Sequence, residues 1–339
     1  MGLSAAGASP YTRVVDRPPR NPELERLVVD VLRSTPEPGA GPGAQARAEG
    51  WQVYADWLLS LGEPVGEWLA ASLRADESSD AVAPIRAKLD AIERACSFRL
   101  VDPALADLSE VPELARIADL TWERGFITGA TLRTHEFRAW DSELLGHTPD
   151  HLLEVVLASP SACMLHTLRV DALRFAAVGS RHSSVAELLA ALPDPLALRE
   201  LELVDSSVSL TQAPIGARAL ARVPELERLV VVTDELGRPQ ERVVEVVEAL
   251  IGGLGPRVRE LELRLRGVGD LVVEALLGAG VLERLHSLLL GHVGEAGAAR
   301  ILAAGERFRR LEGFILRHTR VEDATAAALA RLGASVRRH

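Results

Sequence analysis

A short apolar motif recurs along the second half of the chain and constrains its fold more than any other feature. The motif reads apolar-x-x-apolar-x-apolar, and successive copies begin 26 to 38 residues apart. The clear copies begin at Leu165, Leu198, Leu226, Val258, Leu285 and Leu311, and a weaker copy begins at Ile127. Self-similarity at such an interval is typical of repeat architectures.

Segments with helical spacing of apolar residues lie between the copies. They cover residues 183–192, 215–223, 242–250, 270–277, 296–304 and 322–332. A single strand–helix unit cannot bury its own apolar side, so neighbouring units must stack. We therefore predict an α/β solenoid of about seven units, with parallel strands inside, helices outside and a curved, concave sheet.

The composition agrees with such a core. Apolar residues make up 47% of the chain but aromatic residues only 4%, so the interior must be mainly aliphatic. Residues 1–20 lack periodicity and are expected to be disordered. A helical domain is predicted for residues 21–110, followed by the repeat domain over residues 111–339.

The helical domain shows start and stop signals. Asn21 is a candidate N-cap, followed by Pro22 in the first turn. A second helix over residues 51–61 would place Val53, Tyr54, Trp57 and Leu58 on one side. The segment Gly62-Glu63-Pro64 would end it. Further helices are expected over residues 65–73 and 79–98.

The repeats resemble the ribonuclease-inhibitor-like class of leucine-rich repeats, whose unit is about this long. That class usually carries Asn or Cys eight positions after the first Leu, where the side chain bonds to the turn backbone. The corresponding residues here are Leu173, Ser206, Asp234, Arg266, Val293 and Thr319. The backbone N–H and C=O groups of these turns must therefore find other hydrogen-bond partners.

The helical domain resembles a bacterial repeat-companion domain. Its usual signature, YADWL-x-x-x-G-D-P-x-G-E-F, is matched by Tyr54 to Leu58 and by Gly62 to Trp68, with Glu63 for Asp and Trp68 for Phe. Such domains often precede leucine-rich-repeat-like segments introduced by a stretch like Trp122-Glu123-Arg124-Gly125-Phe126. The resemblance implies a bacterial repeat protein and assigns no activity.

Familiar catalytic motifs do not occur in the sequence. There is no phosphate-binding loop, no H-E-x-x-H and no G-x-S-x-G. His286, His292 and His318 come from adjacent repeats, which leaves a metal site as a minor hypothesis. Asp56 and Glu67 are considered as an acid–base pair, although structural roles are favoured. We predict no catalytic residue, cofactor or metal.

Net charge and the absence of targeting signals limit the partners and the cellular location that we expect. A net charge of −10 disfavours nucleic acid and anionic membranes as partners. No secretory signal and no long apolar run suitable for a membrane span is present. Cys96 and Cys163 lack CxxC spacing and are read as reduced thiols, with a disulfide left open. Cytoplasmic localisation is the expectation, and the basic Arg337-Arg338-His339 is read as a tail.

The sheet face away from the helices is the surface predicted to carry function. Because strand side chains alternate, the residues between the motif's apolar positions share this face. Glu200, Arg228 and Glu260 should align as a lateral charge ladder, and exposed apolar residues should form a cluster. The predicted protein-binding residues are Arg169, Glu200, Glu202, Arg228, Val230, Val232, Glu260, Glu262, Leu289, Ile315 and Arg317.

The leading hypothesis is a scaffold or adaptor that binds a partner protein or peptide on this concave face. One alternative is a regulatory subunit or inhibitor of an enzyme that uses the same surface. A less favoured alternative is an enzyme with its site in the helical domain.

Overall fold

The computed structural model describes nine ranges of the 339-residue chain. They are residues 21–34, 42–77, 117–124, 126–133, 149–171, 185–191, 196–204, 218–233 and 240–337. The predicted helix over 79–98, the N-terminal residues 1–20 and Cys96 lie outside them. The chain divides into two compact units, which are described separately.

Among its described residues, the first unit has three α-helices that begin with proline. They are α1 (Pro22–Ser34), α2 (Pro42–Ser60) and α3 (Pro64–Glu77). Proline suits the first helical position because its missing N–H would have no intrahelical partner there. The Asn21 Oδ1 accepts a hydrogen bond from the Leu24 N–H at 3.1 Å, which confirms the predicted N-cap.

Two glycines, Gly62 and Gly66, are required by the geometry of the junction between α2 and α3. Gly62 has a φ of +73°, and the N–H groups of Gly62 and Glu63 donate to the carbonyls of Leu59 and Leu58. These two bonds form a Schellman motif, which ends α2 where predicted. A Cβ on Gly66 would lie 2.6 Å from the Leu59 nitrogen, so a side chain at this position would prevent the close packing of α3 against α2.

The side of α2 that is buried differs from the predicted one. Trp51, Tyr54, Ala55 and Leu58 are buried, whereas Val53 is 55% exposed. Burial at steps of three and four residues is what one face of a helix requires. The expected inward position of Val53 was therefore wrong.

The first unit also takes in two segments from later in the chain, Trp122–Ile127 and Ala158–Met164. Trp51 stacks on Phe126 with ring centroids 5.5 Å apart, and its indole Nε1 donates to Glu123 at 2.7 Å. Arg47 also pairs with Glu123. Phe126 thus completes the aromatic core of the helical unit and Glu123 anchors it, although both lie outside the predicted 21–110 range.

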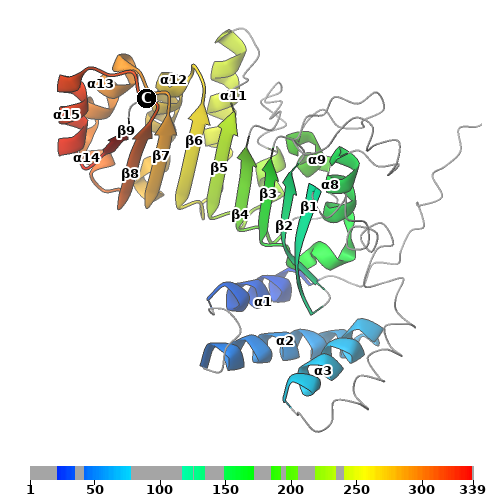
Figure 1. Cartoon of the computed structure of the whole chain (residues 1–339). Coiled ribbons are helices and arrows are strands. Elements are labelled where there is room, and N and C mark those ends of the chain that lie inside the picture. The colour runs from blue at the N-terminus through cyan, green and yellow to red at the C-terminus, as the bar shows by residue number, and fades with distance from the viewer. Residues whose placement is uncertain are drawn as a thin grey trace, which may run out of the picture. The chain divides into compact units, whose positions relative to one another are not determined.

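The second unit contains a nine-stranded sheet whose strands follow chain order from β1 to β9 among the described residues (Figure 1). The strands are β1 (Ala118–Glu123), β2 (Phe126–Arg133), β3 (Thr167–Asp171), β4 (Glu200–Val204), β5 (Arg228–Thr233), β6 (Glu260–Leu265), β7 (Ser287–Gly291), β8 (Gly313–Arg317) and β9 (Ser335–Arg337). The tips of β1 and β2 belong to the first unit. Neighbours from β2 to β9 pair in parallel.

Helices connect these strands. They are α8 (Pro149–Ala158), α9 (Val185–Ala191), α11 (Gln240–Gly252), α12 (Gly269–Ala279), α13 (Glu295–Ala303), α14 (Gly305–Phe308) and α15 (Asp323–Arg331), with 3-10 turns at η3 (Pro160–Met164) and η4 (Val281–Arg284). Figure 1 shows α11 to α15 on one side of the sheet. No helix of the described residues is long and apolar enough to cross a membrane.

The repeated motif forms the core as predicted. Each copy coincides with a strand from β2 to β8, and every apolar residue of the seven copies is at most 9% exposed. Burying one such aliphatic side chain stabilises the fold by about 1.5–3 kcal/mol. The α/β strand–helix array is therefore confirmed, and the strands β1 and β9 extend it beyond the predicted seven units.

A backbone ladder fixes the strands in register. The carbonyl of the residue before one strand accepts N–H groups from two consecutive residues at the start of the next strand. The accepting residues are His166, Arg199, Glu227, Arg259 and His286, with N–O distances of 2.8 to 3.1 Å. The same two-to-one bond recurs at five successive steps, so consecutive strands start level with one another.

Acidic residues bond to the backbone between units in the last repeats, from α12 to α15. The Asp270 carboxylate, in the first turn of α12, accepts the Gly294 N–H at 2.7 Å, just before α13 begins. Glu295 of α13 receives the Glu322 N–H before α15 and the Thr325 hydroxyl at 2.9 Å. Each carboxylate thus satisfies the start of the next helix.

Replacing Asp270 tests this device. We predict that Asp270→Ala lowers the free energy of unfolding by about 1–2 kcal/mol, because the Gly294 N–H loses a charged acceptor. Asp270→Asn keeps an acceptor oxygen and should lose less than half of that amount. Urea unfolding of both variants measures the difference, and equal losses would show that the hydrogen bond is unimportant.

Candidate functional site

The sheet has one face against the helices and one face without any described helix, which we call the open face. Its side chains form three rows across the strands, set by the pairing register. Row one runs Thr167, Glu200, Arg228, Glu260, Ser287, Gly313; row two runs Thr131, Arg169, Glu202, Val230, Glu262, Leu289, Ile315; row three runs Arg133, Asp171, Val204, Val232, Arg264, Gly291, Arg317, Arg337.

All eleven predicted binding residues belong to these rows. Glu200, Arg228 and Glu260 are direct neighbours in row one, as the spacing predicted. Arg169, Glu202, Val230, Glu262, Leu289 and Ile315 share row two, and Val232 and Arg317 share row three. The structure therefore gathers the predicted residues on one surface.

Arg228 is the centre of the charge ladder. Its guanidinium lies 3.7 Å from a Glu200 oxygen and 3.5 Å from a Glu260 oxygen, and it also contacts Glu202. The ladder along row one is thus present, and it reaches diagonally into row two. Sequence spacing alone did not indicate this diagonal contact.

Glu202 joins the ladder to a second arginine. Arg169 Nη1 donates to Glu202 Oε2 at 2.9 Å and Arg169 Nη2 to Asp171 Oδ2 at 3.1 Å. Burial alone would lower the pKa of Arg169, but the hydrogen bonds and charges of Asp171 and Glu202 outweigh it and raise the pKa above the usual value. Glu202 thereby holds two cations while its own side chain is only 15% exposed.

The predicted cluster of exposed apolar residues requires a correction. Val230 is 4% exposed and Leu289 is 8% exposed, so both are buried on the open face. Strands lie about 4.8 Å apart, and longer side chains in neighbouring strands cover a Val or Leu between them. Val230, for example, lies between Glu202 and Glu262.

The part of the face over β7 and β8 differs from the charged centre. Its floor is formed by Leu289 and half-buried Ile315. Three of the four flanking positions on β7 and β8 carry the small residues Ser287, Gly291 and Gly313, and the fourth carries Arg317. Small residues leave the apolar floor of this region less covered than the charged side chains would. Sequence reasoning placed these residues outward but did not include them in the site.

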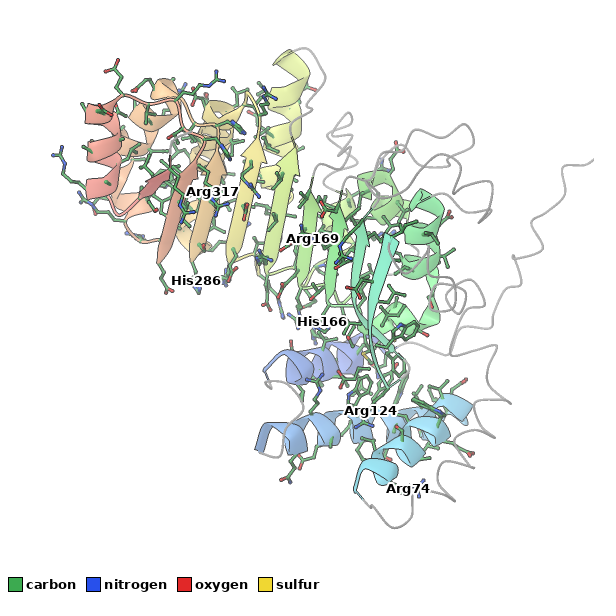
Figure 2. The ribbon with its side chains drawn as sticks, in the orientation of Figure 1. Arg74, Arg124, His166, Arg169, His286 and Arg317 are labelled. Atoms are coloured by element: carbon green, nitrogen blue, oxygen red, sulfur yellow. The ribbon has the colours of Figure 1, made fainter. Side chains whose placement is uncertain are left out.

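Other candidates from the sequence are not assembled into a site. His292 and His318 stack with ring centroids 5.2 Å apart, but His286 precedes β7 and lies at the opposite strand end (Figure 2). Within the described ranges, no three potential ligands gather around a metal position. Asp56 and Glu67 are exposed on different helices, and Cys163 is buried with its Sγ 3.8 Å from the Tyr54 hydroxyl.

The role of Glu202 gives a second prediction. Glu202→Gln removes the charge shared by Arg169 and Arg228 and should lower the free energy of unfolding by about 1–2 kcal/mol. Glu260→Gln is the matched control, because Glu260 is 57% exposed and makes one long contact; its loss should stay below about 0.5 kcal/mol. Chemical unfolding compares the two, and similar losses would contradict the central role of Glu202.

Comparison with known proteins adds a distant structural likeness. No protein-family profile matches the chain, and no curated protein matches it significantly. The structure is similar to the crystal structure of a structural genomics target from Bacteroides fragilis, with 16% sequence identity and a TM-score of 0.38. The similar region covers 56% of this chain and 49% of that one, so it spans about half the length of the Bacteroides protein.

Proposed function

We propose that this chain is a leucine-rich-repeat protein whose open face binds a segment of a partner protein. The observation that carries the proposal is the alignment of side chains from successive strands into three ordered rows on that face. Fold alone does not assign a function. The proposal therefore rests on the chemistry of this surface.

The ion-pair network around Glu202 supports this proposal because its side chains are already held in place without a partner. Arg169, Glu202 and Arg228 hold one another in place, because both arginines donate hydrogen bonds to Glu202. Ordered side chains lose less conformational entropy on binding than free ones. A charged surface of this kind favours specificity and fast association more than raw affinity.

The part of the open face over β7 and β8 supports the proposal because it offers an apolar surface for a partner to contact. Leu289 and Ile315 lie side by side in row two, next to small residues that admit another backbone. Apolar anchors beside polar surroundings are the usual arrangement of protein interfaces. Parallel rows extending over many strands suit an elongated polypeptide better than a small molecule, which usually requires a concave pocket.

Photo-crosslinking in cells of the native host tests the proposal. A benzoylphenylalanine placed at Glu260 lies on the open face, where the wild-type side chain is 57% exposed. The same group at Glu274 lies on α12 and replaces a side chain of 61% exposure. We expect one discrete protein adduct from position 260 and none from position 274. Both positions are exposed, but only position 260 lies on the open face.

A second substitution tests whether the adduct depends on the open face. Ile315→Asp places a charge on the apolar floor and should abolish the adduct at position 260, provided that its unfolding midpoint remains that of the parent. An adduct that survives this substitution, or equal adducts from both positions, contradicts binding at the open face.

A further inference from the structure

The end of row three carries three arginines, of which only Arg264 pairs with a carboxylate among the described residues, that of Glu262. Arg264 on β6, Arg317 on β8 and Arg337 on β9 share the row, with Gly291 on β7 between the first two. Arg317 and Arg337 are directly opposite each other. Like charges in this position on neighbouring strands oppose folding, so the pair does not serve the stability of the sheet.

Arg317 differs from the other arginines of the face. Arg169, Arg228 and Arg264 each lie against a carboxylate. For Arg317 the described part of the chain supplies no ion pair, and its Nε, like that of Arg264, is buried without a hydrogen-bond acceptor there. Arginine remains charged and can only donate, so this buried donor needs an acceptor from outside the described residues.

Gly291 shapes the space in front of Arg317. A Cβ on Gly291 would lie 2.9 Å from Cγ of Arg264, so the stem of Arg264 leans over the glycine towards β7. A larger residue would push Arg264 away from the strand that adjoins β8. The glycine therefore allows Arg264 to approach the arginine pair, and Figure 2 shows Arg317 on the open face of the sheet.

We propose that Arg264, Arg317 and Arg337, which we call the arginine end, bind the carboxylate of an acidic residue in the partner segment. This inference rests on the proposed function and specifies the partner's chemistry. Guanidinium groups form paired hydrogen bonds with carboxylates, which are stronger than neutral ones. Arriving at this end, a carboxylate would supply the acceptor that Arg317 lacks and offset the repulsion from Arg337.

The spacing predicts a motif in the partner. Leu289 and Ile315 lie in row two, two residues before row three along the strands, which is a distance of about 6–7 Å. A partner segment extended along the strands would therefore place an apolar residue on row two and an acidic residue two positions later at the arginine end. A single carboxylate is favoured over a nucleic-acid backbone because Glu260 and Glu262 on the same face and the net charge of −10 would repel a polyanion.

Fluorescence anisotropy with the full chain tests this motif. The probe is a fluorescein-labelled peptide of repeated Leu-Ser-Asp triplets, and repeated Leu-Ser-Asn and Leu-Ser-Lys peptides are the controls. We expect the Asp peptide to bind at least about tenfold more tightly than the Asn peptide. Arg317→Gln should weaken binding of the Asp peptide by about fivefold or more.

Two variants separate this role from a general effect of charge. Arg331→Gln makes the same charge change on α15 and should alter the affinity less than about twofold. Arg317→Glu should transfer the preference to the Lys peptide. The unfolding midpoint of Arg317→Gln should stay unchanged or rise, because the variant relieves repulsion without losing a protein contact.

The outcomes distinguish the inference from the proposed function. Equal effects of Arg317→Gln and Arg331→Gln, or a lower unfolding midpoint for Arg317→Gln, overturn the arginine end as a binding site. If position 260 crosslinks to a partner while the Asp peptide fails to bind, the open face remains the interface and the acidic motif is wrong. If crosslinking fails while the Asp peptide binds in an Arg317-dependent way, the arginine end binds acidic peptides, and the proposed binding of a partner protein in the host is contradicted.

Discussion

The carbonyl that precedes each strand is the constraint on which the rest of the structure depends. It accepts two N–H groups from the start of the next strand, as His166 does for Arg199 and Glu200 at 2.8 and 2.9 Å. Buried backbone groups need partners, and this bond supplies them at the same edge of the sheet in five successive steps. Level strand starts then align the core side chains on one face and the charged rows on the other.

Much of the fold could be predicted because it depends on local patterns. The seven motif copies coincide with strands β2 to β8. The spacing of Glu200, Arg228 and Glu260 was sufficient to place them side by side, since parallel strands of similar length align equivalent positions. The segment around Phe126 was predicted within the repeat domain, whereas its contacts group it with the helical unit. Its packing on Trp51 is a contact between distant segments, for which the sequence gives no spacing rule.

The candidate site was only partly predictable for a related reason. Alternation along a strand tells which face a side chain occupies, but its exposure depends on neighbours from other strands. Val230 and Leu289 were expected to be exposed and are buried, whereas Arg337 was taken for a tail and lies in β9 opposite Arg317. The open face therefore combines a neutralised, ordered centre with a basic end, a division that emerges only from the register.

An engineered disulfide between Ser287 and Gly313 tests that register most directly. A Cβ at Gly313 would lie 3.6 Å from the Ser287 Cβ, within the range that disulfides require. In a background of Cys96→Ser and Cys163→Ser, the pair Ser287→Cys and Gly313→Cys should oxidise completely, as measured by thiol titration and intact mass. The pair Leu289→Cys and Gly313→Cys, one row apart, should keep free thiols. Closure of the second pair instead of the first would contradict the alignment on which the open face depends.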